Sequence, residues 1–173
     1  KHPDFAAAAA ATEKAQPKAV IVATAGTTFT HYIKAVQGTA ARPAYYGFSV
    51  ASLDVINREL KDKARGIILA QIMPSLRNTT IPVVAEYLSL LRAKSPNAQP
   101  SASQFEGFVH ARLLVEGLRR TGRNLTTESF TKTMEDAGEI SFGRFSVKYS
   151  PKSHNGSTYV ELAIVDAEGS LRY

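Results

Sequence analysis

The sequence predicts an α/β fold, in which a parallel sheet is flanked by helices. Three short apolar runs, at residues 19–23, 44–47 and 66–71, have the length and continuity of buried strands. Segments with helical periodicity separate these runs, and strands that alternate with helices of this length form parallel sheets through right-handed crossovers. Ligands of such sheets bind at the carboxyl ends of the strands, so we expect a site there.

The composition is that of a folded globular protein: 173 residues, 44% hydrophobic and 21% charged. Cysteine is absent, which excludes disulfides, thiolate metal sites and cysteine nucleophiles. The net charge is +6, but no basic stripe interleaved with aromatic residues indicates nucleic-acid binding. No apolar run approaches the roughly 20 residues of a membrane span, so direct membrane insertion is not expected. Any secretion signal would lie upstream or have been removed.

The first 37 residues predict one helix followed by a strand-to-helix unit. Asp4 can cap a helix that runs to about Lys14, after which Pro17 breaks the pattern. The apolar run 19–23 follows as a strand. Small and hydroxyl residues at 24–28 can then cap a helix from Phe29 to about residue 36, whose apolar residues share one face.

The pattern repeats over the next 35 residues. A turn at 38–43 leads into the strand at 44–47, a helix at 52–60 and a third strand at 66–71. After residue 73 the pattern changes, because three helices at about 80–94, 101–121 and 126–137 follow without an intervening strand.

The middle of these three helices is the most apolar. Ser101 and Gln104 predict a capping box at its start, and it should end near Gly122. Its apolar residues leave little polar surface, so we expect burial on most sides. If nothing covers it, we expect the chain to associate with itself or to be less stable than its size suggests.

The C-terminal region alternates or clusters apolar residues at 142–149 and 159–165 around a polar turn at 151–157. This pattern predicts a β-hairpin formed by these two segments.

Candidate catalytic and metal-binding groups are few. The four histidines do not pair with each other or with carboxylates at the spacing of a zinc motif, so no metal site is expected. His110 lies on the most apolar helix, where a core role is the simpler interpretation. Ser49 lacks the flanking glycines of a nucleophile elbow. A hydrolase-type enzyme that uses Ser49 or His110 remains the alternative to a binding protein.

The segment from Ala25 to Thr28 could bind an anion, since the free amides of a helix N-terminus point towards it. It has neither the P-loop lysine nor the three-glycine dinucleotide pattern, and it suits a carboxylate or a polar small molecule better. Equally, Thr27 or Thr28 could merely cap the helix.

The order of several segments resembles one known family. Its landmarks are Asp4-Phe5-Ala6, the strand end at 23–26, Tyr45-Tyr46-Gly47, residues 64–67, the helix motifs at 104–108 and 114–122, and the closing segments 142–151 and 154–157. In this order they are similar to the leucine/isoleucine/valine-binding proteins, which are type I periplasmic solute-binding proteins of branched-chain amino-acid ABC transporters. The resemblance spans nearly the whole chain.

The resemblance implies a two-lobed binding protein rather than an enzyme, with no cofactor. Residues 1–72 would be βα units of the C-terminal lobe, 73–140 helices of the N-terminal lobe, and 141–173 a crossing segment with the closing β-hairpin. The central strands of the N-terminal lobe would be missing, so the resemblance implies a fragment with parts of both lobes. Such proteins bind a solute between the lobes in the bacterial periplasm and deliver it to the membrane subunits of the transporter. The sensor domain of a receptor would share this fold.

The family's ligand contacts carry over to Ala25, Gly26 and Thr27, to Phe48 and Ser49, and more loosely to Phe105. Members that bind amino acids place a carboxylate after the second of these strands, where this sequence has Ser49. Loss of that charge-assisted hydrogen bond removes roughly 1.5 to 3 kcal/mol, so an α-amino acid is not the expected ligand. We expect a small polar or carboxylated solute.

Overall fold

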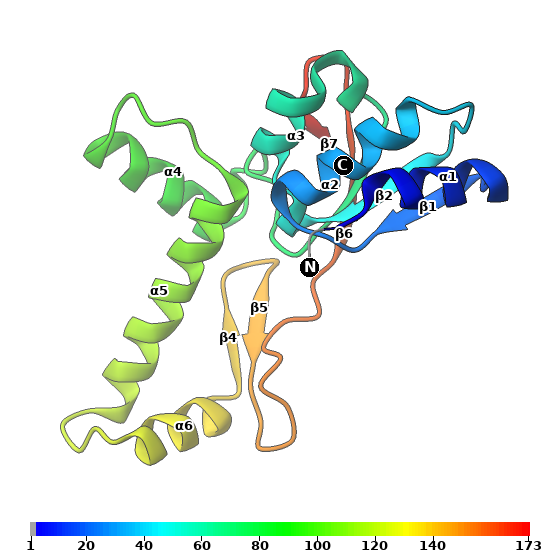
Figure 1. Ribbon diagram of the computed structural model, residues 1–173. Helices are drawn as coiled ribbons and strands as arrows, with labels where there is room; N and C mark the ends of the chain where they lie inside the picture. The colour runs from blue at the N-terminus through cyan, green and yellow to red at the C-terminus, as the bar shows by residue number, and fades with distance from the viewer. Residues whose placement is uncertain (1–2) are drawn as a thin grey trace. The chain divides into compact units, whose positions relative to one another are not determined.

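The structure, a computed structural model, describes residues 3–173 and divides into two compact units (Figure 1). Unit 1 combines the chain up to Ile72 with Val160–Tyr173, and unit 2 is Met73–Tyr159. Residues 141–159 belong to unit 2, where Phe145 and Val147 are part of the core. The assignment of residues 1–72 and 73–140 to two different lobes stays a prediction.

The sheet of unit 1 has five strands in the order β1-β2-β3-β6-β7. The pairs β1–β2 and β2–β3 are parallel, whereas β3–β6 and β6–β7 are antiparallel. The strands are β1 (Ala19–Val22), β2 (Ala44–Phe48), β3 (Ile68–Gln71), β6 (Glu161–Val165) and β7 (Leu171–Arg172). The three predicted strands are therefore present and parallel, and the prediction of an α/β fold is confirmed.

The helices of unit 1 are α1 (Phe5–Ala15), α2 (Gly26–Gln37) and α3 (Leu53–Leu60), with short 3-10 turns at Ser49–Ala51 and Lys61–Ala64. As predicted, Asp4 caps α1, since its side chain accepts the backbone N–H of Ala7 at 2.9 Å. Helix α2 begins three residues earlier than expected. Gly26, at φ +52°, turns the chain into the helix, and Thr27 and Thr28 continue it.

The core of unit 1 lies on one face of its sheet. Phe29 and Ile33 of α2 and Ile56 of α3 are fully buried against strand residues such as Leu69 and Val165. Apolar burial of this kind is the main source of stability for a βα unit.

The opposite face of the same sheet is apolar as well. The pairing register places its side chains in two rows that run across neighbouring strands. One row consists of Ile21, Tyr46, Ile68 and Ile164, and the other of Phe48, Ala70 and Leu162. Ile21 is 72% exposed and Leu162 62%. We call this surface the bare face, defined by Ile21, Tyr46, Phe48, Ile68, Leu162 and Ile164.

Helix α2 approaches strand β2 closely at Gly47. A Cβ atom built on Gly47 would lie 2.6 Å from Phe29 Cε2 and 3.1 Å from Leu69 Cδ2. Glycine is thus the residue that lets the Phe29 ring reach the centre of the sheet.

Unit 2 contains α4 (Pro82–Lys94), α5 (Ala102–Thr121), α6 (Thr127–Asp136) and a two-stranded sheet of β4 (Glu139–Ser141) and β5 (Ser146–Lys148). The three predicted helices are present. Ser101 caps α5 by accepting the N–H of Gln104, but the capping box is incomplete, since the Gln104 side chain accepts the hydroxyl of Tyr87 at 3.1 Å.

The predicted hairpin between residues 142–149 and 159–165 is wrong. Strand β5 pairs with β4, and β6 pairs with β3 and β7. The side chains explain the difference, because Val147 is buried in the core of unit 2 and Val165 in that of unit 1.

Burial of α5 on most sides is also not observed. One stripe is buried, formed by Phe105, Val109, Leu113 and Gly117. Leu114, Val115 and Leu118 are exposed by 38–52%.

Asp166 organises the turn between β6 and β7. Its carboxylate accepts the backbone N–H of Ser170 at 2.7 Å and of Glu168 at 3.1 Å, and Arg172 Nε lies 2.6 Å away. The N–H of Ser170, followed by Arg172 and the N–H of Glu168, holds the pKa of Asp166 below its usual value. A carboxylate with a depressed pKa stabilises the fold above its unfolded pKa of about 3.9, and this contribution is lost as the pH falls through the folded value.

We therefore expect Asp166→Asn to lower the free energy of unfolding at pH 6 and to have a smaller effect at a strongly acidic pH, because the wild-type carboxyl becomes protonated as the pH falls through its depressed folded pKa. Urea unfolding of both proteins at the two pH values measures the difference. An equal effect at both would contradict a role for the charge.

Candidate functional site

The first part of the candidate site is the connection from β1 to α2. Ala25 is the N-cap of α2, with φ −110° and ψ 154°, and no side chain caps the helix. The first amides of a helix have no partner within it, and they carry the positive end of the helix dipole. Gly26, Thr27 and Thr28 therefore present N–H groups and hydroxyls at the end of β1.

Gly26 is suited to this position by its conformation. Its φ of +52° strains a residue with a side chain, and apart from its chain neighbours and its own helix backbone no heavy atom of the described chain lies within 4 Å of a Cβ built there. The backbone can thus be approached closely at this point.

The second part follows β2. Phe48 is 44% exposed, and Ser49 begins the 3-10 turn Ser49–Ala51. Within residues 3–173, the Ser49 hydroxyl makes no hydrogen bond with another protein group. Because β1 and β2 are parallel and Val22 pairs with Gly47, the segments after the two strands leave the sheet at the same edge. The structure thus places Ala25, Gly26 and Thr27 at the same edge as Phe48 and Ser49.

The edge carries no formal charge of its own. Residues 23–28, 48–52 and 70–73, which follow or close the three parallel strands, include no Asp, Glu, Lys or Arg. The groups available to a ligand are amides, hydroxyls and the Phe48 ring. Such a set can hold a carboxylate or a neutral polar group by hydrogen bonds, and it offers no counter-ion to an ammonium.

Thr24 is a residue that the sequence interpretation did not single out. Its Oγ1 is buried and has no hydrogen-bond partner in the described part of the chain. A buried unpaired hydroxyl is costly. Its position directly after the predicted strand at 19–23 was the feature of the sequence that could have identified Thr24 as a candidate site residue.

Phe105 lies elsewhere, in the core of unit 2. Its side chain is fully buried, and its ring centroid is 5.3 Å from that of Tyr87. The residue therefore has no surface to offer a ligand in this structure, and packing explains its presence.

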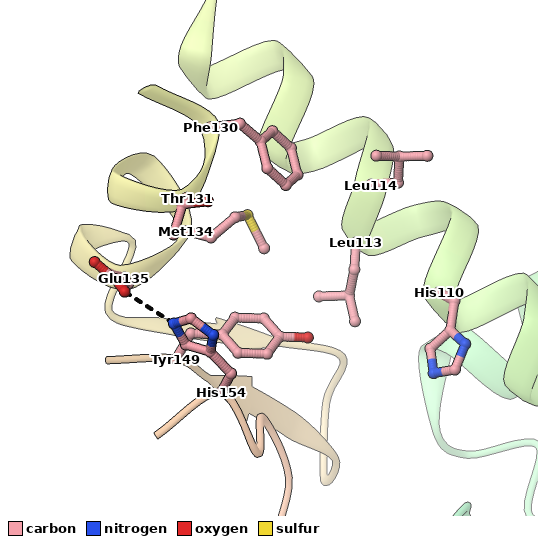
Figure 2. Close-up of a pocket in the computed structure, with 9 residues that line it drawn as sticks. All are labelled: His110, Leu113, Leu114, Phe130, Thr131, Met134, Glu135, Tyr149 and His154. Atoms are coloured by element: carbon pink, nitrogen blue, oxygen red, sulfur yellow. Dashed lines mark hydrogen bonds and ion pairs between the residues drawn. The ribbon is translucent and has the colours of Figure 1, made fainter. Parts of the chain in front are cut away.

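The alternative catalytic residues are not brought together with a partner. His110 is an exposed residue of α5 in unit 2, where it lines a pocket with Leu113, Leu114 and His154 (Figure 2). Its ring makes no hydrogen bond within residues 3–173. Over the same residues, no group of three His, Cys, Asp or Glu side chains could hold a metal ion. None of the described helices has both the length and the apolarity needed to cross a membrane.

Comparison with known proteins identifies the family. The sequence family described as periplasmic binding protein matches residues 1–170. No curated protein matches the chain in sequence. Among solved structures, an extracellular ligand-binding receptor from Verminephrobacter eiseniae is 25% identical, with a TM-score of 0.84 over 99% of this chain and 50% of that one.

Two further structures are similar at 25% identity. A possible leucine/isoleucine/valine-binding protein from Rhodopirellula baltica has a TM-score of 0.82 over 90% of this chain and 42% of that one. A substrate-binding periplasmic protein from Ralstonia solanacearum has a TM-score of 0.78 over 96% and 49%. The chain thus spans about half the length of these structures. The resemblance indicated by the order of its segments is confirmed, and the chain belongs to the periplasmic binding protein family, with a fold of the type I leucine/isoleucine/valine-binding kind.

Proposed function

We propose that the protein binds a small polar or carboxylated solute at the carboxyl edge of the unit 1 sheet, through Ala25, Gly26, Thr27, Phe48 and Ser49. The observation that carries this proposal is the N-terminus of α2, which no side chain caps and which lies at the same edge as the unpaired Ser49 hydroxyl. Membership of a family of binding proteins supports solute binding as the activity.

The chemistry of the edge selects among solutes. Its amides and hydroxyls can donate to a carboxylate, and the half-exposed Phe48 ring can contact an apolar part of the ligand. An α-amino acid also needs a partner for its ammonium, and residues 23–28, 48–52 and 70–73 supply no carboxylate. The proposal therefore favours carboxylic acids and amides without an ammonium group.

Delivery to the membrane subunits of an ABC transporter, from the periplasm, is the second part of the proposal. The sensor domain of a receptor would share this fold, so the proposal of transport rests on membership of the periplasmic binding protein family. If this is correct, cells that lack the gene should take up the identified ligand more slowly than wild-type cells.

A thermal-shift screen of the full-length protein against aliphatic and aromatic carboxylic acids, amides and α-amino acids tests the ligand class. A ligand that binds the folded state stabilises it, by about 2.7 kcal/mol at a hundredfold excess over Kd. Stabilisation by acids or amides supports the proposal, whereas stabilisation by α-amino acids alone contradicts it. Turnover of a stabilising compound that is lost in Ser49→Ala or His110→Ala would instead favour the hydrolase alternative.

Within the site, Thr27→Ala and Ser49→Ala should each weaken binding of the best ligand by about 0.5 to 1.5 kcal/mol, because each removes one hydrogen bond. Calorimetric titration of the full-length variants measures this. Ser89→Ala, on an exposed position of α4, is the matched control and should leave the affinity unchanged. Unchanged affinity in both site variants would remove the two residues from the site.

A further inference from the structure

Unit 2 contains a pocket of about 340 Å³ that the proposed solute site does not use (Figure 2). Three elements form the pocket. The lining residues are His110, Leu113 and Leu114 on α5, Phe130 and Met134 on α6, and Tyr149 and His154 in the segment after β5. Its volume falls within the range of small-molecule sites.

Close packing at both ends fixes the walls of this pocket. At Gly117 of α5, a Cβ atom would lie 2.6 Å from both Met134 Sδ and Phe130 Cε2, so the two helices touch there. The pocket opens one to two turns earlier on α5. At Gly156, a Cβ atom would lie 2.7 Å from Tyr149 Cε1, so the C-terminal loop rests directly on the Tyr149 ring.

The loop that carries His154 is tied down by two contacts. Ser150 and Ser153 exchange backbone hydrogen bonds of 3.0 Å, which closes a tight turn directly before His154. His154 Nε2 then lies 2.8 Å from Glu135 Oε1 on α6 (Figure 2). The histidine therefore holds the loop against α6 at one end of the pocket.

The lining is apolar apart from one formal charge. Leucine, phenylalanine, methionine and tyrosine side chains form most of the wall, and Glu135 is the one carboxylate among the residues that line the pocket. The Glu135 side chain is only 18% exposed. One turn earlier on α6, Lys132 is bound to Asp136 at 2.8 Å, and its charge also interacts with that of Glu135.

We propose that this pocket binds a small amine with an apolar body, and that the Glu135 carboxylate receives the ammonium group. Glu135 Oε1 lies 2.8 Å from His154 Nε2, and the second oxygen accepts no hydrogen bond from the described residues. The Phe130 and Tyr149 rings add aromatic surface that suits an organic cation. His110, at the other end, and the hydroxyl of Tyr149, beside His154, can accept or donate a further hydrogen bond to a polar substituent (Figure 2).

The test compares three probes with the same aromatic body and different heads: phenethylamine, 2-phenylethanol and 3-phenylpropanoate. Isotope-labelled protein is titrated with each and followed by heteronuclear NMR. We expect phenethylamine to bind most tightly and to shift the signals of pocket residues. Equal binding of the alcohol, tighter binding of the acid, or no binding of the amine at millimolar concentration would overturn the proposal.

Two pairs of variants locate the site. Glu135→Gln should weaken phenethylamine binding about tenfold or more, because the hydrogen bond to a charged group is lost. Glu139→Gln makes the same change at an exposed position of β4, away from the residues that line the pocket, and should change the affinity less than about twofold. Leu114→Trp should fill the pocket and block binding, while Val115→Trp, on the next position of α5, should not. Equal affinity in Glu135→Gln and wild type, or equal effects within either pair, would overturn the assignment.

Discussion

Replacement of Phe29 by alanine is expected to lower the free energy of unfolding by about 3–5 kcal/mol, the usual cost of removing a fully buried phenylalanine. The ring is completely buried between α2 and the sheet of unit 1, where it fills the space above Gly47 and beside Leu69. Urea unfolding followed by circular dichroism measures the change. Phe48→Ala is the matched control, since this ring is 44% exposed and its removal should cost less than about 1 kcal/mol.

A double-mutant cycle tests the reason for this cost. Gly47→Ala in the wild-type background should destabilise by about 1–3 kcal/mol, because its Cβ would lie 2.6 Å from the Phe29 ring. In the Phe29→Ala background the contact is gone, and the same substitution should cost much less. Additive effects would show that the close approach of α2 to the strand does not restrict Gly47.

Substitution on the bare face is expected to change the association state of the 173-residue chain. The two apolar rows that cross the sheet form a contiguous surface, whereas folded monomers seldom expose an apolar patch larger than a few hundred Å². We therefore expect the wild-type chain to self-associate and to bind a hydrophobic dye. Leu162→Lys and Ile21→Lys should each reduce both, as measured by sedimentation equilibrium and dye fluorescence.

Two control substitutions separate the bare face from other exposed apolar residues. Leu125→Lys alters a single exposed leucine between α5 and α6 and should leave the sedimentation behaviour unchanged. Val115→Lys alters the exposed side of α5, the surface that the sequence had suggested. If only Val115→Lys reduced association, the interface would lie on α5 and not on the sheet.

The elements that the sequence predicted well are those defined by local pattern. The apolar run from Ala19 is short and continuous, which predicts a strand, and the run does form β1, although Ile21 is 72% exposed because β1 lies at the edge of the sheet. The Asp4 cap and the Pro17 break bound α1 in the same local way. The prediction of strand pairing in the C-terminal region was wrong, because an alternation with a period of two residues shows which face of a strand is apolar but not which strand lies beside it. One partner of β6 is β3, and the whole of unit 2 separates these two strands in the sequence.

The candidate site, too, was predictable only where a local pattern determines the position of a residue. The parallel register brings the ends of β1 and β2 to one edge, so the placement of Thr27 and Ser49 at the same edge followed from the prediction of parallel strands. The burial of Phe105 did not follow, because an apolar residue on an amphipathic helix has the same pattern whether it faces a core or a ligand. The Glu135–His154 contact joins residues from α6 and a distant loop, and no local pattern could have indicated it.

The antiparallel pairing of β3 with β6 has a consequence for synthesis of the chain. Gln71 and Glu161 face each other at the end of this ladder, so unit 2 occupies, in topological terms, the loop of a β-hairpin. A ribosome adds about 5–20 residues per second, and β6 therefore emerges on the order of 10 s after β3. During that interval the inner edge of β3 has no partner strand. Rapid docking of α2 and α3 onto the first three strands would then be the step that protects the nascent sheet from mispairing.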